Sequence, residues 1–248
     1  MSDSCLLPNG RVLRYTFNER LMHWVAGVSY VYLLLTGLAF WSPWLFWLAV
    51  ILGGGTISRE LHPWAGVIFI IAVVWMYTTW ASQMHSTERD REWWRALPHY
   101  VRNEDEEMPA EDRFNAGQKS LFWGFFWCGI ALFLSGLVLW FPHWIPWSWR
   151  ILRLIAVIVH PVAALLTIAL FMIHVYMGMV ERGSFGAVVR GDVTRKWAAR
   201  YHRAWYEQVV PGSAPEERSV APGAPIAPMA PMAQSAEPSP LPPIGRGY

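Results

Sequence analysis

Charged side chains are scarce in this chain of 248 residues, and the shortage limits what the protein can be. Only 15% of its residues are charged and 54% are hydrophobic, whereas an ordinary soluble domain is about 25% charged. The formal net charge of +2 gives nucleic acid no electrostatic reason to bind. Cysteine is almost absent, and Cys5 and Cys128 lie far apart in sequence and setting. We therefore expect no soluble domain, no nucleic-acid partner and no disulfide framework.

The N-terminus lacks the apolar core of a cleavable signal peptide. What the chain does have is long apolar runs, and the first of them should serve as both targeting signal and first span. A span needs about 20 mostly apolar residues. Four stretches qualify, at 23–41, 61–81, 120–141 and 151–180. A shorter apolar run at 43–52 ends in three glycines, and we interpret it as an interfacial or re-entrant segment.

The distribution of Lys and Arg predicts how the spans are oriented. Positive residues gather in 11–20, 89–119 and 182–203, while the opposite side holds only Arg59, Arg150 and Arg153. Both termini should therefore be cytoplasmic, in a multi-pass protein of a bacterial inner membrane. We predict an all-α membrane four-helix bundle. Its parts are a cytoplasmic segment at 1–22, a helical domain at 23–182 with a cytoplasmic loop at 85–119, a cytoplasmic segment at 183–210 and a disordered Pro/Ala-rich tail at 211–248.

Four of the eight histidines fall inside the predicted spans, where titratable side chains are costly and usually functional. His160 and His174 are 14 residues apart, which is about 21 Å along a helix and close to four full turns. Both therefore point from nearly the same helix face at different depths. His62 begins a span that enters from outside, and His23 begins one that enters from the cytoplasm. Depth sorts the four into an outer pair, His62 with His160, and an inner pair, His23 with His174.

Two histidine pairs at two depths are what two stacked haems with two axial imidazoles each require. The chain has no C-x-x-C-H sequence, so these would be non-covalent b-type haems. A haem lying against a helix also needs a small residue one turn from its ligand. The residues four positions after the four histidines are all small, namely Gly27, Gly66, Ala164 and Gly178.

Other interpretations of the histidines remain open. A single membrane histidine often hydrogen-bonds a neighbouring helix, and small residues at this spacing also occur in ordinary helix packing. A zinc site is disfavoured, because the two pairs lie about 20 Å apart and neither has a third ligand in sight. The set of four, paired by depth, favours haem.

Several longer motifs extend this pattern beyond the histidines. They are R-L-M-H-W at 20–24, L-H-P at 61–63, F-N-A-G-Q-K at 114–119, I-H-V-Y-M at 173–177, G-D-V-T-R-K-W-A at 191–198 and H-R-A-W-Y at 202–206. With these motifs the chain resembles the cytochrome b subunit of respiratory formate dehydrogenase, over roughly residues 14–210. The glycine-rich outer loop and the proline-rich tail depart from that family's pattern.

The resemblance implies a particular electron circuit. A molybdenum or tungsten subunit oxidises formate outside the membrane, and an iron–sulfur subunit passes the electrons on. The family's outer haem matches His62 and His160, and its inner haem matches His23 and His174. Menaquinone or ubiquinone would be reduced beside the inner haem, at residues matching Asn115, Gly117 and Gln118 with His174 nearby.

Three alternatives to this interpretation remain. The electron donor could be a hydrogenase or another molybdenum enzyme, because related membrane cytochromes serve these. The chain could instead be a haem-free membrane anchor or proton-conducting subunit whose histidines relay protons. Without the resemblance, Asn115 and Gln118 are better explained as helix caps, because Asn is a favoured capping residue.

Overall fold

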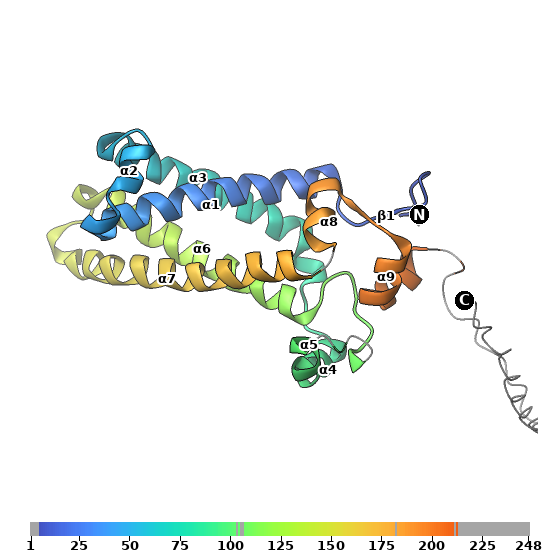
Figure 1. Ribbon diagram of the computed structural model, residues 1–248. Coiled ribbons are helices and arrows are strands. Elements are labelled where there is room, and N and C mark those ends of the chain that lie inside the picture. Colours follow the sequence, from blue (N-terminus) through green and yellow to red (C-terminus); the bar gives the residue numbers. More distant parts are fainter. Residues whose placement is uncertain (1–4, 103, 105–106, 182, 211, 213–248) are drawn as a thin grey trace, which may run out of the picture. The chain divides into compact units, whose positions relative to one another are not determined.

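The computed structural model describes residues 5–102, 104, 107–181, 183–210 and 212. Four long helices dominate it (Figure 1): α1 Phe17–Trp41, α3 Gly55–Trp80, α6 Ala116–Trp140 and α7 Arg150–Val180. Each belongs to a segment long and apolar enough to cross a membrane, so the prediction of four spanning helices is confirmed. The predicted tail at 211–248 lies outside the described residues, apart from Gly212.

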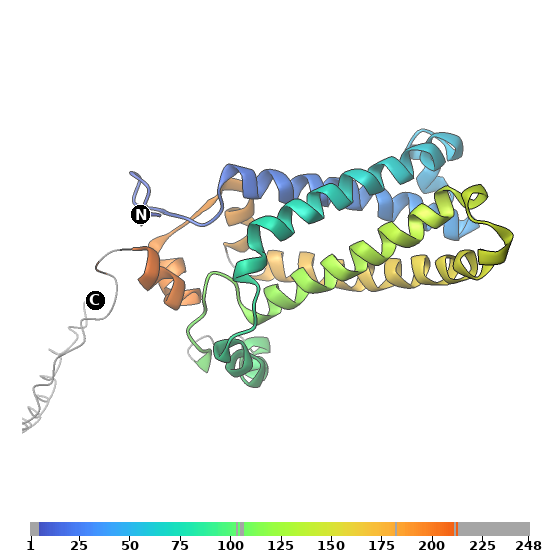
Figure 2. The same cartoon turned by 180° about the vertical axis from the view of Figure 1, so that it is seen from behind.

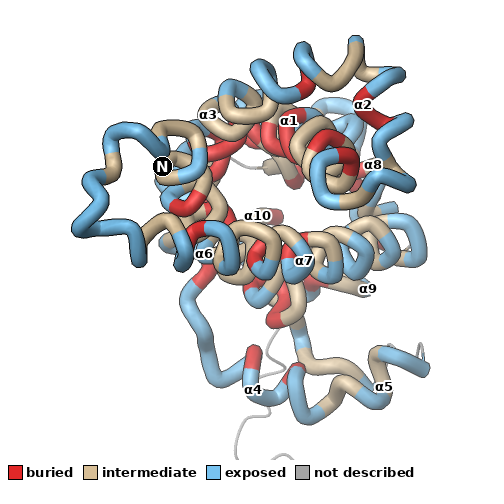
Figure 3. Tube along the Cα trace, turned by 90° about the vertical axis from the view of Figure 1, so that its left-hand side faces the viewer, coloured by how far each residue is buried: buried red, intermediate tan, exposed pale blue. Residues whose placement is uncertain are grey.

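The four long helices pack as two hairpins. The most extensive contacts join α1 to α3 and α6 to α7, and α3 also packs on α6, whereas α1 and α7 contact each other far less. Figures 1 and 2, which view the bundle from opposite sides, show the helices running side by side. Buried positions lie on their inward faces (Figure 3), with Tyr30, Phe69 and Val73 in one cluster. Large apolar side chains such as Val28 and Ile71 are exposed on the outward faces, as expected for helices surrounded by lipid.

Three of the spans begin several residues earlier than the apolar runs suggest, because α3 starts at Gly55 and not at 61, and α1 and α6 each start at a capping box. α1 starts at Phe17, where Thr16 and Glu19 cap each other's backbone N–H groups. α6 starts at Ala116 through the same reciprocal arrangement between Asn115 and Gln118. The predicted starts at 23 and 120 were therefore late, because a capping box adds a polar first turn that hydropathy does not count.

Short helices close one end of the bundle, which we call the outer end, following the orientation predicted from the charges. They are η1 Pro43–Leu45, α2 Trp47–Ile51, η4 Pro142–Trp144 and η5 Trp147–Trp149. The apolar run at 43–52 thus forms pieces too short to span a membrane. Its Leu48 and Ala49 are buried against Ala39 of α1.

The opposite, inner end holds the remaining elements. η2 Ala81–Gln83, α4 Glu88–Arg95 and α5 Leu97–Val101 follow α3, and α8 Ser184–Arg190, α9 Arg195–Tyr201 and α10 Arg203–Val209 follow α7. Strand β1 Val12–Leu13 pairs antiparallel with β2 Asp192–Val193. This pairing buries Val12 among Trp197, Trp205 and other side chains of α8 to α10. We call the β1–β2 pair together with α8, α9 and α10 the inner-end cap.

Candidate haem-binding site

The inner histidine pair joins two helices that otherwise stand apart. His23 of α1 and His174 of α7 have ring centroids 5.8 Å apart, with planes inclined by 43°. His174 also meets the ring edge of Phe125 on α6 at 6.0 Å. The Nδ1 atom of His23 is buried and has no hydrogen-bond partner among the described residues. His174 is exposed, because α1 and α7 do not close on each other there.

The outer pair faces across the bundle from the two hairpins. His62 of α3 and His160 of α7 have ring centroids 6.4 Å apart, with planes inclined by 57°. A proline follows each of them inside its helix, at Pro63 and Pro161. The structure therefore brings together the same two couples that helix depth predicts from the sequence.

Each outer histidine has a hydroxyl partner on the neighbouring helix of its own hairpin. Thr36 Oγ1 of α1 lies 2.7 Å from Nδ1 of His62. Ser135 Oγ of α6 lies 3.0 Å from Nδ1 of His160. These hydroxyls lie 26 and 25 residues from their histidines, so the histidine motifs alone do not point to them.

An internal repeat could have revealed them. The sequence L-T-G-L-A-F-W-S-P at 35–43 matches L-S-G-L-V-L-W-F-P at 134–142, and H-P-W-A-G at 62–66 matches H-P-V-A-A at 160–164. The two hairpins are thus versions of one unit, and the outer site takes one histidine from each. The glycine of each repeat lies against its histidine ring. A Cβ on Gly37 would be 3.7 Å from His62 Cε1, and a Cβ on Gly136 would be 3.3 Å from His160 Cε1.

The inner pair breaks this repeat. The position matching His23 in the second hairpin is Phe122, and the position matching His174 in the first hairpin is Met76. Phe122 and Met76 both pack against one buried cluster, formed by Met22, Trp80, Met84 and Phe114. At the inner level, one side of the bundle therefore holds imidazoles and the other is filled with apolar side chains.

The space beside the paired rings fits a flat, apolar cofactor. Added Cβ atoms on Gly27, Gly66 and Gly178 would meet nothing within 4 Å, so each glycine borders open space one turn from its histidine. Within the described part of the chain, no group of three or more His, Cys, Asp or Glu side chains gathers as a metal site. A pair of imidazoles without further protein ligands suits haem iron better than zinc.

The predicted quinone residues lie at the N-terminus of α6, where they form its capping box. Asn115 Oδ1 accepts from the Gln118 N–H at 2.9 Å, and Gln118 Oε1 accepts from the Asn115 N–H at 3.2 Å. A Cβ on Gly117 would come within 3.2 Å of the Trp93 ring. The prediction that Asn115 and Gln118 cap a helix is therefore confirmed. The amide nitrogen of Gln118 remains without a hydrogen bond to any described residue.

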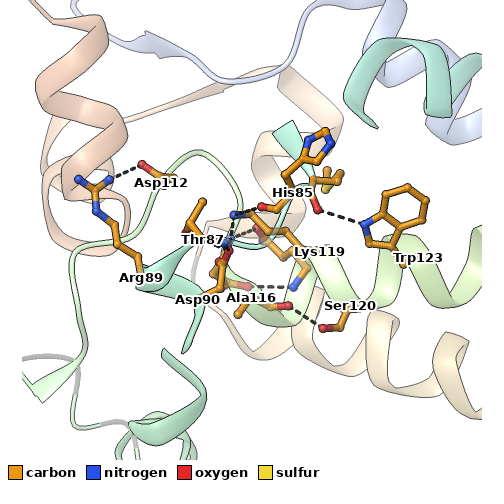
Figure 4. A network of polar contacts seen from close by, with 12 residues as sticks. His85, Thr87, Arg89, Asp90, Asp112, Ala116, Lys119, Ser120 and Trp123 are labelled. Carbon is orange, nitrogen blue, oxygen red and sulfur yellow. Dashed lines mark hydrogen bonds and ion pairs between the residues drawn. The ribbon is translucent and has the colours of Figure 1, made fainter. Parts of the chain in front are cut away.

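A buried ion pair holds this turn in place (Figure 4). Lys119 and Asp90 are each 6% exposed, and Lys119 Nζ donates to Asp90 Oδ2 at 2.7 Å. Burial opposes ionisation of Asp90, but hydrogen bonds from Lys119 and Thr87 outweigh it and lower the pKa of Asp90. Trp123 donates to the Met84 carbonyl at 3.0 Å. The polar loop after α3 is thereby fixed to the first turns of α6.

Two buried titratable groups connect this turn to the inner-end cap. Glu111 accepts from Trp93 Nε1 at 2.7 Å and from Asn115 Nδ2 at 3.3 Å. Burial raises the pKa of Glu111 to about 7, and the Glu181 charge adds to this effect. His202 is fully buried 3.6 Å from the Glu111 carboxylate. Burial, followed by the nearby charge of Arg14, lowers the pKa of His202 well below its ordinary value.

The larger of two cavities described at the inner end does not involve the predicted quinone residues. It measures about 500 Å³ and is lined by α1, the end of α3 and parts of the cap, including Arg14, Glu19, Met22, Trp75 and Arg113. A second space of about 10 Å³ is close to the volume needed for one water molecule. Asp90, Glu111 and Asn115 line that smaller space.

Comparison with known proteins places this architecture in a family. Residues 14–187 match the family described as prokaryotic cytochrome b561. The formate dehydrogenase cytochrome b556(fdo) subunit of Escherichia coli (strain K12) is 32% identical over 199 residues, which cover 80% of this chain and 93% of that subunit. The nitrate-inducible cytochrome b556(Fdn) subunit of the same strain is 25% identical over 206 residues, covering 83% and 95%. The formate dehydrogenase cytochrome b556 subunit of Haemophilus influenzae is 28% identical over 220 residues, covering 88% and 91%.

These matches agree with the four spanning helices and the paired membrane histidines. A cytochrome b of this kind is a multi-pass membrane protein of electron transport that carries haem b. The chain belongs to the prokaryotic cytochrome b561 family and is a relative of the cytochrome b subunits of formate dehydrogenases.

Proposed function

We propose that the chain is the di-haem subunit of a formate dehydrogenase complex, and that it carries electrons across the membrane to a quinone. The observation that carries this proposal is the presence of two facing histidine pairs, one at each level of the bundle. Haem b bound at each pair would take up and release single electrons. Two imidazoles at each site would leave no open axial position, which suits electron transfer rather than oxygen binding.

The residues of the bundle have distinct roles in this proposal. His62 and His160 hold the outer group, and His23 and His174 hold the inner one. The glycines one turn away provide room for the flat ring. The long helices satisfy their own backbone polar groups, which keeps water and ions out of the region between the two levels.

The direction of transfer follows from the predicted orientation. The outer end would meet an iron–sulfur partner and, through it, the molybdenum or tungsten subunit that oxidises formate. This is supported by the relatives, whose names identify them as formate dehydrogenase subunits. Quinone reduction at the inner end would take protons from the cytoplasm. Each charge moved across the membrane then stores about 2.3 kcal/mol per 100 mV.

Menaquinone or ubiquinone would bind near the turn formed by Asn115, Gly117 and Gln118, on the side of His174. The free amide of Gln118 can donate a hydrogen bond to a quinone carbonyl. Its carbonyl oxygen already caps α6, which fixes the side chain in place. The fixed capping geometry supports binding without rearrangement of the loop.

Haem counting on the purified complex tests the first part of the proposal. His62→Ala and His160→Ala should each remove one b-type haem and leave the other, seen in reduced-minus-oxidised spectra and pyridine haemochrome assays. His99→Ala, in the short helix α5 at the inner end, is the matched control and should keep both haems. Wild-type protein that shows no b-type absorption, although it was produced with haem supplied, would leave the haem-free anchor as the better explanation.

Quinone reduction is tested separately. Gln118→Ala should slow the reduction of a soluble quinone analogue by formate while both haems remain. Loss of haem in this variant would return Gln118 to a purely structural role. Identification of the subunits that purify with the chain distinguishes formate dehydrogenase from a hydrogenase or another molybdenum enzyme as the electron donor.

A further inference from the structure

The proton positions at the outer histidine pair can be assigned from the hydroxyl contacts. Thr36 Oγ1 lies 2.8 Å from the carbonyl oxygen of Tyr32, one turn earlier on the same helix. A carbonyl oxygen can only accept, so the hydroxyl proton of Thr36 points at Tyr32. The 2.7 Å contact to His62 must then run the other way, with Nδ1–H of His62 donating to the Thr36 oxygen.

The second hairpin repeats this arrangement. Ser135 Oγ donates to the carbonyl oxygen of Ala131 at 2.6 Å and lies 3.0 Å from Nδ1 of His160. Thr36 is fully buried and Ser135 is 7% exposed, so bulk water does not compete for either contact. Both outer imidazoles therefore carry their proton on Nδ1 and leave the Nε2 lone pair free for a metal.

The inner pair has no such partners. The buried Nδ1 of His23 has no hydrogen bond to a described residue, and none is formed by His174 with that part of the chain either. The repeat explains the difference, because His23 and His174 stand at positions occupied by Phe122 and Met76 in the other hairpin. Among the described residues, a hydroxyl that accepts from a span histidine is therefore found at the outer pair and not at the inner pair.

We propose that Thr36 and Ser135 are positioning residues that lower the reduction potential of the outer haem iron. This inference rests on the proposed binding of haem at His62 and His160. A histidine that donates its second ring N–H becomes a more basic ligand. A more basic ligand stabilises ferric iron more than ferrous iron. A hydroxyl that already donates to a carbonyl is polarised and accepts more strongly.

The consequence is a bias in the direction of electron transfer. Two hydroxyls act on the outer site, and no hydroxyl among the described residues contacts the inner histidines, so their contribution favours electrons leaving the outer iron for the inner one. This is the direction needed if electrons enter at the outer end. The bias would be part of the fold and would not depend on bound partners.

Redox titration of the purified, haem-loaded complex tests this proposal. Thr36→Val keeps the side-chain shape but removes the acceptor, and Ser135→Ala makes the smaller change in the other hairpin. Each should raise the outer-haem potential and leave the inner-haem potential unchanged. A tenfold change in the ferric preference corresponds to 59 mV for one electron, and we expect a shift of this order. The haem that survives in His62→Ala identifies the inner potential.

Two further variants control the experiment. Ser29→Ala removes a buried hydroxyl from α1 whose bonds within the described residues go to the Val25 and Ala26 carbonyls, so it should move neither potential. Thr36→Ser keeps the acceptor and should restore the wild-type outer potential. Loss of the outer haem in Thr36→Val, but not in Thr36→Ser or Ser29→Ala, would also support positioning.

Clear outcomes oppose the proposal. Both haems retained with an unchanged outer potential in Thr36→Val and Ser135→Ala would overturn it, as would an equal shift of both haems. Wild-type complex with fewer than two haems would instead contradict the proposed function itself. The two failures are therefore distinguishable in one preparation.

Discussion

Glu111→Gln should stabilise the contact between the inner-end cap and the α6 turn at neutral pH. Burial raises the pKa of Glu111 to about 7, whereas the carboxyl group in an open segment titrates near 4.5. The folded state therefore keeps a proton that the open state has lost between these two values. The contact weakens as pH rises from 4.5. Above about pH 7 Glu111 is charged in both states, and the folded state then carries the full free-energy cost of burying that charge. A glutamine in this place has no charge to bury.

The size of the effect follows from the two pKa values. Their difference amounts to about 3 kcal/mol above pH 7. The variant weakens one hydrogen bond, because a glutamine amide cannot accept from both Trp93 and Asn115, and this costs about 1 kcal/mol at any pH. The net gain is about 2 kcal/mol at pH 8 and close to zero near pH 5.

Hydrogen exchange measured by mass spectrometry on the purified complex provides the assay. The backbone N–H of Trp205 donates to the backbone carbonyl of Glu111 at 3.3 Å, so the backbone amides of α10 report the opening of this contact. Exchange there should be about 30-fold slower in the variant than in wild type at pH 8, and equal near pH 5. Comparing the two proteins at the same pH cancels the titration of His202. A ratio that does not change with pH would refute the assignment of the proton to Glu111.

Three further predictions concern the inner end and the haem cradle. Lys119→Met should destabilise the protein by about 3–5 kcal/mol in thermal denaturation, because Asp90 would stay buried without its cation, and adding Asp90→Asn should recover much of the loss; equal loss in both variants would contradict the pairing. His202 stays neutral in the closed cap, whereas in the open cap its imidazole gains a proton below its ordinary pKa of 6.5, so the cap loosens as pH falls. Protection of α9 amides from exchange, corrected for intrinsic rates, should therefore decline below pH 6.5. A flat profile would argue against this role of His202. Gly66→Leu should fill the space beside His62 and halve the haem content in a haemochrome assay; full haem content would show that the outer haem does not lie there.

Features that depend on composition and depth were predictable from the sequence. The four spans follow from apolar length, and the histidine couples follow from the helical rise between His160 and His174. Helix starts were less predictable, because Thr16 and Asn115 are polar residues whose capping role depends on a partner three positions later.

Tertiary features of the site could not be read in the same way. Thr36 and Ser135 reach their histidines only because of how the two helices of each hairpin are rotated against each other. The sequence places His202 outside the spans, in a loop or tail, yet the inner-end cap buries it completely. The pKa of Glu111 is raised by burial and then by the charge of Glu181, and both effects exist only in the folded chain.

The β1–β2 pairing and the bonds beside it connect the start of the first span to the segment that follows the last one. Arg14 and Tyr15 both donate backbone N–H groups to the Gly191 carbonyl, and Arg20 reaches the Val189 carbonyl at 2.6 Å. These bonds link the start of α1 to the segment that follows α7, although the two helices make little contact within the bundle. The two hairpins can therefore be tied together at this end only after α7 has been made, because Val189 and Gly191 follow it in the chain.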